Sequence, residues 1–409
     1  MDVNPRVDSE IGRLREVIVH RPGQEVERLT PLNHAELLFD DLMDPGRARA
    51  EHDQFVEVME GEGIEVHKLR TLLSQTLHHE HARQAVLDRT LNERRLGPVL
   101  TPALREWTAD LSADRLTAMC VDGLTVDEWK SVSPVRSLVT RTLEDEDFLI
   151  RPLPNHLFTR DASAWIHGGV AVNSMSRLAR ERESLHYSVI YQYHPRFAPW
   201  DFHWWSRGTS GAIRSAEGGD ALVVGDGIGV FGVSERTTPQ GVERLAVKMF
   251  EAGHAHTVLA VVLPHVRTFM HLDTVLTQVD RDAFLLYPRL GDVRTMTLRP
   301  GPDGGAPIVE DMHYDLRRAL EVLMGRSLRF ISPDGTFSDV DREQWNDGFN
   351  ALAIAPGKVI TYDRSPLCNA ALRRAGIDVI EIQGAELGRG RGGPRCMSCP
   401  VVRDPVDQD

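Results

Sequence analysis

Hydrophobic and polar positions change their spacing several times near the start of the chain. Arg15–Arg21 has a β-branched centre, which predicts a strand because branched side chains favour extended backbone. Along Pro45–Gly63, polar residues alternate with apolar ones and the segment ends on glycine, so a helix is expected there. Ile64–Leu69 predicts a second strand. Together these segments predict a β–α–β unit.

The strand pattern disappears from about Leu72 to Asp147, and signals for helix ends multiply. Thr101–Pro102 offers an N-cap followed by proline, and Ser112 can cap a further helix that Gly123 would close. Thr125–Glu128 is a capping box, in which the glutamate reaches back to the cap residue. We expect a small helical bundle here, inserted into a β-rich protein.

Short strand patterns return after Phe148, mixed with helical ones, and no repeat is detectable. Several expected strands are adjacent, so an α/β fold is expected but a plain doubly wound sheet fits poorly. The expected strands are 162–173, 221–233, 257–263, 282–287, 352–355, 359–362 and 379–382, and the expected helices are 240–252, 313–324 and 367–375.

Composition places the chain in a broad class. Its 409 residues are 41% hydrophobic, which is enough for a buried core in one large domain or two smaller ones. No run of eighteen apolar residues occurs and the first residues are polar, so we expect neither a membrane span nor a secretory signal. Four cysteines are too few for a disulfide scaffold, which favours a reducing compartment and a cytoplasmic protein.

The net charge indicates which kinds of binding partner suit the protein. There are 47 basic and 60 acidic residues, a formal charge of -13. That average field repels nucleic acid, so we expect no nucleic-acid partner. It suits a small cationic substrate, although solubility alone also produces an acidic balance. Homo-oligomerisation is left open.

The stretch Gly388–Pro400 is glycine-rich and contains two cysteines. Its glycines at 388, 390 and 393 match the spacing of a dinucleotide-binding loop. That loop opens a helix and is followed by an acidic residue about twenty positions later. Pro394 and Pro400 break any helix, and only 409 − 393 = 16 residues follow, so we reject a dinucleotide cofactor.

Two alternatives are left for Cys396 and Cys399. As a C-x-x-C pair they could bind zinc or act as a redox dithiol, but no second pair completes a zinc site and no helix follows. Alternatively, Cys396 is a nucleophile on a mobile glycine loop, where Arg391 or Arg395 holds an anion or favours a thiolate. A nucleophile also needs an acid/base partner and a substrate clamp.

Candidate partners stand in three other segments. In Met270–Asp273 the residues His271 and Asp273 are two apart, so on an extended segment an imidazole would lie beside a carboxylate. Glu217–Asp220 is an acidic turn whose two glycines permit positive φ and close backbone approach. Asn155–Asp161 supplies a carboxylate, an amide and an aromatic ring just before an expected strand. Each has an ordinary structural interpretation when taken alone.

The combination is one thiol, one imidazole and three carboxylates, Asp161, Glu217 and Asp273. Carboxylates do not help an acyl-transfer site, which needs an oxyanion hole. They suit a planar cation: a guanidinium has five N–H donors in a fixed fork, and carboxylates bind it bidentately. Two carboxylates would leave its central carbon facing a nucleophile.

Five segments, in this order, resemble bacterial arginine deiminase of the guanidino-group-modifying superfamily. The likeness covers essentially the whole chain, including Leu37–Asp41 and the helical insert. It implies a five-bladed α/β propeller of pseudo-fivefold ββαβ modules, with residues 1–72 and 149–409 as the catalytic domain and 73–148 as a helical insertion. The segments are Asn155–Asp161, Glu217–Asp220, Glu235–Thr237, Met270–Asp273 and Arg391–Pro400.

The resemblance also implies a reaction and a set of roles. The reaction is the hydrolysis of free L-arginine to L-citrulline and ammonia through a covalent S-alkylthiouronium on Cys396, with no cofactor and no metal. Agmatine deiminase, dimethylarginine hydrolase, amidinotransferase and a non-enzymatic arginine sensor are the alternatives. The implied roles are nucleophile for Cys396, proton transfer for His271 and Glu217, guanidinium binding for Asp161 and Asp273, α-carboxylate binding for Arg180 and Arg236, pocket lining for Asn155 and Phe158, and loop closure for Arg391.

Overall fold

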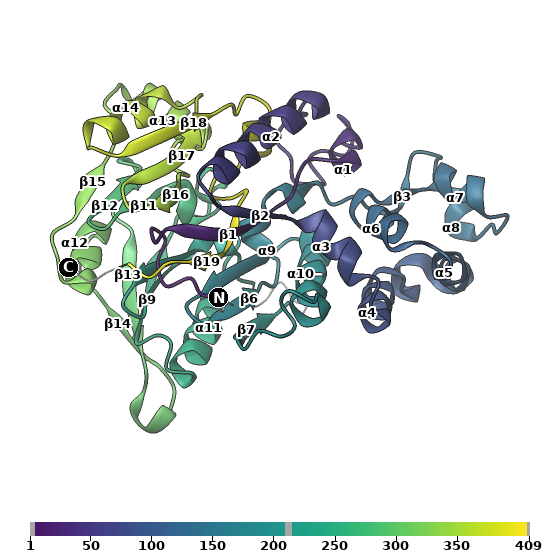
Figure 1. Cartoon of the computed structure of the whole chain (residues 1–409), viewed down its shortest axis with the longest axis horizontal. Coiled ribbons are helices and arrows are strands. Elements are labelled where there is room, and N and C mark those ends of the chain that lie inside the picture. The colour runs from purple at the N-terminus through teal and green to yellow at the C-terminus, as the bar shows by residue number, and fades with distance from the viewer. Residues whose placement is uncertain (1–4, 209–214, 407–409) are drawn as a thin grey trace.

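The computed structural model describes residues 5–208 and 215–406 (Figure 1). Within these ranges five three-strand units repeat one pattern: an antiparallel pair, then a third strand parallel to the second. The strands, unit by unit, are β19 (Cys399–Arg403), β1 (Leu14–Val19) and β2 (Glu65–Lys68); β5 (Ser163–Ile166), β6 (Gly169–Val172) and β7 (His203–Arg207); β8 (Ala221–Gly225), β9 (Ile228–Val233) and β10 (Thr257–Val262); β11 (Leu276–Asp280), β12 (Ala283–Leu286) and β15 (Arg329–Ile331); β16 (Leu352–Ala355), β17 (Lys358–Tyr362) and β18 (Asp378–Ile382).

A parallel strand cannot follow by a tight turn, so a helix crosses over before the third strand of each unit. Each unit is therefore a ββαβ module. The crossover helices are α2 (Pro45–Gly61), α10 (Glu181–Tyr193), α11 (Pro239–Glu251), α12 (Leu316–Met324) and α14 (Pro366–Arg374). Short helices also lie in the connections, among them α1 (Gln24–Glu27) before α2 and α13 (Phe337–Trp345) before β16.

Two units depart from the simple pattern. The first joins the two ends of the chain, because Ile18 near the start pairs with Cys399 near the end. The third is extended by a hairpin of β13 (Arg294–Arg299) and β14 (Ile308–Asp311), which reaches away from the other sheets at the bottom of Figure 1. The fold is thus α/β with several small sheets.

A helical segment projects on the right of Figure 1, as the capping signals predict. It shares one hydrophobic cluster with the β5–β6 unit and α10: Leu73, Leu116 and Trp129 from the helical segment pack in the same cluster as Trp165 and Tyr187. Its elements are α3 (Leu69–Thr76), α4 (Glu80–Thr90), α5 (Glu93–Ala109), α6 (Ala113–Asp122), β3 (Leu124–Thr125), α7 (Val126–Val132), α8 (Leu138–Thr142) and β4 (Phe148–Ile150).

Most helix-end predictions are confirmed. The Ser112 side chain caps α6, which Gly123 ends at φ 85°, and Thr125 opens α7 with a capping box. The helix start expected at Thr101–Pro102 is wrong. Helix α5 kinks at Gly97 (φ 75°), so Thr101 lies inside the second half and its hydroxyl donates to the Gly97 carbonyl. No helix in the described part of the chain is long and apolar enough to cross a membrane.

Candidate active site

The candidate residues stand in equivalent places in the five units. Each lies just before the first strand of a unit: Asp161 in α9 (Thr159–Ala162) before β5, Glu217 before η4 (Gly218–Asp220) and β8, Asp273 in η6 (Leu272–Thr274) before β11, and Cys396 before β19. The fifth place, before β16, holds Asn350. Because these strand starts occupy the same position in every module, segments distant in sequence deliver side chains to one site.

Cys396 is held between two of these segments. Its backbone N–H donates to Asn350 Oδ1 at 3.0 Å, and its Sγ lies 3.5 Å from Asp273 Oδ2. The amide of Asn350 in turn donates to the Asp273 carbonyl, and the Cys396 carbonyl accepts from the Arg160 N–H. The thiol is therefore tied to the start of β11, β16 and β5 at once.

His271 lies between two carboxylates. Its Nε2 is 2.9 Å from Glu217 Oε2, and its Nδ1 is 3.6 Å from Asp161 Oδ1. Burial lowers the pKa of this imidazole, but the charge of Asp161 and the hydrogen bond to Glu217 outweigh it and raise the pKa to about 9. Burial raises the pKa of Glu217, but His271 and Arg236 outweigh that and lower it to about 2. At neutral pH the pair is an imidazolium on a carboxylate.

The carboxylate expected beside His271 was Asp273, and this prediction is wrong. The extended backbone ends at His271, and Leu272–Thr274 turn into a 3-10 helix, which takes Asp273 away from the shared face. Close approach at the Glu217–Asp220 turn is confirmed, because a Cβ on Gly219 would lie 2.6 Å from His271 Nδ1. Positive φ is not used at either glycine of that turn.

Asp161 and Asp273 are each held by a buried arginine that also binds a glutamate. Arg180 donates to Asp161 Oδ2 at 2.5 Å while its other nitrogens bond Glu183. Arg395 donates to Asp273 Oδ2 at 2.7 Å while its other nitrogens bond Glu10. All six side chains are buried. Asp161 and Asp273 are thus each fixed by a buried arginine that is itself anchored by a glutamate.

Each clamp leaves one carboxylate oxygen without a hydrogen bond among the described residues, although Asp161 Oδ1 lies 3.6 Å from His271 Nδ1. Among the described residues, Asp161 Oδ1 and Asp273 Oδ1 are buried and accept no hydrogen bond. A buried carboxylate oxygen without a hydrogen-bond donor is costly. These two oxygens are therefore the acceptors that a ligand with several N–H donors would satisfy.

Burial raises the pKa of Cys396 well above the ordinary value of a thiol, and the charges of Asp273, Asp161 and Asp347 raise it further. Arg395 acts in the opposite direction, as expected from the sequence, but it is outweighed. Without a cation at the site Cys396 is thus a thiol. A bound cation between the carboxylates would lower its pKa.

The remaining candidates surround this centre. Arg236 donates to Glu235 and lies 3.8 Å from Glu217 Oε2. The side-chain amide of Asn155 donates a hydrogen bond to the Leu37 carbonyl, in the Leu37–Asp41 segment. The Phe158 ring packs so closely on Gly392 that a Cβ there would lie 2.3 Å from it. A residue with a side chain would collide with this ring, which explains why position 392 is a glycine.

Arg391 is in the left-handed region (φ 63°) and lies over Trp345, with its Cζ 3.6 Å from the ring centroid. Among the described residues none of its three side-chain nitrogens makes a hydrogen bond. Nearby Asp347 is buried, which raises the pKa of its carboxyl to about 7 although Arg391 opposes the shift.

Sequence reasoning missed several of these groups. Glu10 stands in a segment without any motif, and Glu183 lies three residues after Arg180 in a helix that was not predicted. Asn350 had a detectable signal, since it precedes the expected strand 352–355. Asp347 had none.

Three ligand atoms of Asp161, Glu217 and His271 lie within 4.8 Å of one another, close enough for a metal ion. Metal binding requires a neutral imidazole, so His271, whose pKa is raised to about 9, would have to release a proton before it could bind a metal at neutral pH. Cys396 and Cys399 do not form a common thiol site: Cys399 Sγ is 3.2 Å from the Ser163 carbonyl and packs in a different hydrophobic cluster. These residues fit a proton-transfer site better than a metal centre.

Comparison with known proteins adds an independent result. The arginine deiminase family matches the chain over residues 35–403. Solved structures with similar folds include an amidinotransferase of saxitoxin biosynthesis from Microseira wollei (15% identity, TM-score 0.57, 100% of this chain and 99% of that chain). A second is the N-terminal domain of ArgZ, a cyanobacterial arginine dihydrolase (14%, 0.53, 95% and 97%). A third is dimethylarginine dimethylaminohydrolase from Pseudomonas aeruginosa with citrulline (13%, 0.51, 95% and 99%).

Proposed function

Because the chain belongs to the arginine deiminase family, and is therefore a guanidino-group-modifying enzyme, we propose that it hydrolyses free L-arginine to L-citrulline and ammonia. The observation that carries this proposal is the pair of buried oxygens that accept no hydrogen bond from the described residues, Asp161 Oδ1 and Asp273 Oδ1, near the thiol of Cys396. A guanidinium placed between them satisfies both oxygens and turns its central carbon toward Sγ.

The reaction begins when substrate binds. The positive guanidinium lowers the pKa of Cys396, the thiol releases its proton, and Sγ attacks Cζ to form a tetrahedral adduct. The imidazolium of His271 gives its proton to the leaving nitrogen, the C–N bond breaks and ammonia departs. Cys396 then carries an S-alkylthiouronium.

Hydrolysis reverses the roles. His271, now neutral, takes a proton from water, and the hydroxide attacks the same carbon. When the second adduct collapses, the C–S bond breaks, citrulline leaves, and the proton from its new oxygen returns the sulfur to a thiol. The proton that the thiol released at the start converts ammonia to ammonium. Glu217, ionised through both steps, holds the ring and stabilises its charged form.

The α-carboxylate of arginine is assigned to Arg236 and Arg180, by the resemblance to the family. Among the described residues the Arg236 side chain makes one hydrogen bond, to Glu235, and a longer ion pair with Glu217, so it can turn to a carboxylate at lower cost than Arg180. Arg180 is occupied by Asp161 and Glu183 and must exchange one of these bonds. We expect Arg236 to contribute more to the affinity for the carboxylate, while Arg180 acts chiefly through Asp161. Asn155 and Phe158 line this pocket and Arg391 closes its loop.

The five ββαβ modules support the proposal that the chain forms a five-bladed α/β propeller, with 1–72 and 149–409 as the catalytic domain and 73–148 inserted. Helix α3 begins at Leu69 and ends at Thr76, so this boundary falls inside a helix. Four cysteines without a disulfide in the described chain fit a reducing compartment, and we propose a cytoplasmic enzyme.

The experiment that tests the function is product analysis with purified protein. Citrulline and ammonia should appear in equal amounts from L-arginine, with little turnover of agmatine, which lacks the carboxylate. Replacing Arg236 by Ala should raise KM for arginine far more than KM for agmatine. Preferred turnover of agmatine or methylated arginine, or transfer of the amidino group to an amine, would assign a different activity to the site.

A further inference from the structure

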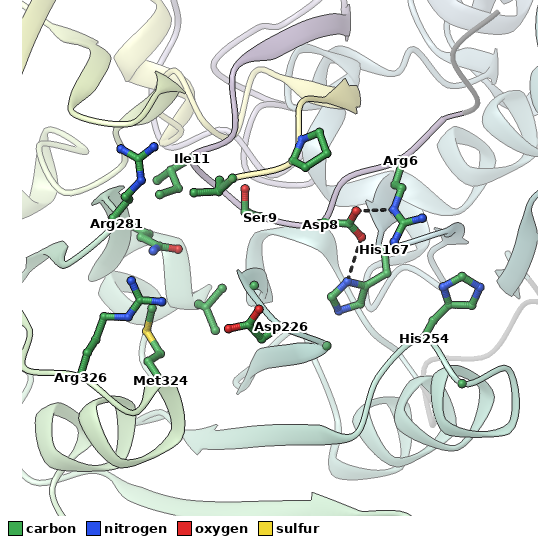
Figure 2. A pocket seen from close by; sticks show the side chains of 17 residues that line it. Arg6, Asp8, Ser9, Ile11, His167, Asp226, His254, Arg281, Met324 and Arg326 are labelled. Atoms are coloured by element: carbon green, nitrogen blue, oxygen red, sulfur yellow. Dashed lines mark hydrogen bonds and ion pairs between the residues drawn. The ribbon is translucent and has the colours of Figure 1, made fainter. Parts of the chain in front are cut away.

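A cavity lies at the opposite ends of the strands that carry the candidate active site (Figure 2). The candidate active site stands before β5 and β8, whereas the turns after these strands, at His167 and Gly225–Gly227, line this cavity. A five-residue strand such as β8 spans roughly 17 Å, so the two sites are separate. The cavity has a volume of about 470 Å³, within the usual range of small-molecule sites.

Two buried polar atoms in the cavity wall have no partner among the described residues. One is Oε1 of Gln278, a side chain that is 2% exposed and donates through Nε2 to the Asp280 carbonyl. The other is Nε2 of His167, which is 3% exposed and has its Nδ1 3.4 Å from Asp8. Leaving such atoms unsatisfied is costly. Both side chains line the cavity, although neither of these two atoms is accessible at its surface, so a polar ligand reaches them only when the wall rearranges.

The cavity also has unused positive charge. Arg281 and Arg326 lie at the left of Figure 2, opposite His167 and Asp8. Both are exposed, and neither guanidinium forms a hydrogen bond or ion pair with the residues that the structure describes. Arg6, the third arginine of the lining, is already paired with Asp8. The two arginines at the rim can thus take an anionic group bidentately.

We propose that this cavity is a second ligand site, for a small anion that carries a carboxylate or phosphate group together with N–H or O–H donors. The anionic group binds Arg281 and Arg326. The donor groups satisfy Gln278 Oε1, and His167 Nε2 bonds the ligand as donor or acceptor according to its protonation. An uncharged or purely apolar ligand would leave these groups unpaired.

A short chain segment connects this site with the thiol. Ser9 and Ile11 line the cavity, while Glu10 between them reaches the other way to Arg395, which holds Asp273 beside Cys396. Glu10 is also fixed to β8, since its N–H donates to the Val223 carbonyl and its Oε1 accepts from the Val223 N–H. Ligand that shifts this segment therefore shifts the clamp on Asp273.

Binding is tested by calorimetry with two probes, inorganic phosphate and L-malate, which separate phosphate from carboxylate chemistry. Wild type should bind at least one of them, and the double variant Arg281→Ala/Arg326→Ala should bind it at least tenfold more weakly, because charge-assisted bonds are lost. Arg141→Ala, which removes an exposed arginine elsewhere, is the matched control and should bind like wild type. No heat with either probe, or equal affinity in the double variant, overturns the proposal.

Coupling is tested separately and rests on the proposed deiminase activity, whereas calorimetric binding does not. Saturating probe should change kcat/KM for arginine at least twofold in wild type and leave the double variant unchanged. Demonstrated binding with unaltered kinetics would overturn the connection through Glu10. Absence of any arginine turnover together with normal binding would overturn the proposed function and leave the second site standing.

Discussion

Glu217→Gln tests the acid/base pair most closely. The substitution keeps the shape of the side chain but removes the charge that faces His271 Nε2 at 2.9 Å. The pKa of His271 is raised from 6.5 to about 9, which corresponds to roughly 3 kcal/mol in favour of the imidazolium. A hydrogen bond to a charged group contributes about 1.5–3 kcal/mol. Removing it should therefore lower the pKa by roughly 1–2 units.

The assay is the pH dependence of kcat/KM, which reports the free enzyme. Because its pKa is raised to about 9, the His271 ring stays protonated at neutral pH and loses its charge as the pH rises through about 9. We therefore expect the alkaline limb of wild type near pH 9, and that of Glu217→Gln roughly 1–2 units lower. An NMR titration of the His271 ring in a Cys396→Ala background should give the same shift without turnover.

Glu235→Gln is the control. It removes a carboxylate from the other side of Arg236 and has no contact with His271, so KM should change while the alkaline limb stays in place. If Glu217→Gln leaves both the limb and the NMR titration unmoved, Glu217 does not set the proton affinity of His271 and the acid/base assignment fails.

Three further outcomes follow from the same contacts. Glu183→Gln should reduce kcat/KM about 10–100-fold, measured at pH 7, because Arg180 loses its buried anchor and orients Asp161 poorly; unchanged kinetics would remove the clamp from the account. Cys399→Ala should retain full deiminase activity, since its thiol packs away from the site, and a large loss would revive the dithiol interpretation. The free energy of unfolding should fall as pH drops from 4.5 towards 2, since burial raises the pKa of Glu10 but Arg395 outweighs it and lowers the pKa to about 2; acid titration of Glu10→Gln should lack this component.

Elements with a clear period could be predicted from the sequence. The strand at Arg15–Arg21 and the helix from Pro45 appear as β1 and α2 within two residues, because burial of one face imposes a repeating pattern. Helix α10 was missed because both of its sides are buried, including Arg182, Glu183 and His186, so no polar face marks it. Helix α13 could have been found, since Thr336 and Asp339 form a capping box at its start.

The site residues also fall into those that local sequence patterns reveal and those that they do not. Cys396, His271 and the carboxylates stand in compact segments whose composition points to a cation, and the structure brings them together. Glu10 and Asn350 act through contacts with residues 385 and 46 positions away, which no local pattern encodes. The neighbour of His271 was mistaken because local spacing suggested Asp273, whereas the fold supplies Glu217 from 54 positions away.

The central claim is that Cys396 forms a covalent bond to the guanidino carbon. The most direct measurement is rapid acid quench of the enzyme with L-arginine, followed by peptide mass analysis, with Cys396→Ala alongside. The account predicts a transient adduct on the peptide containing Cys396, with the mass of arginine less one ammonia, and neither adduct nor citrulline in the variant. Citrulline formation by Cys396→Ala, or an adduct on another cysteine, would contradict it.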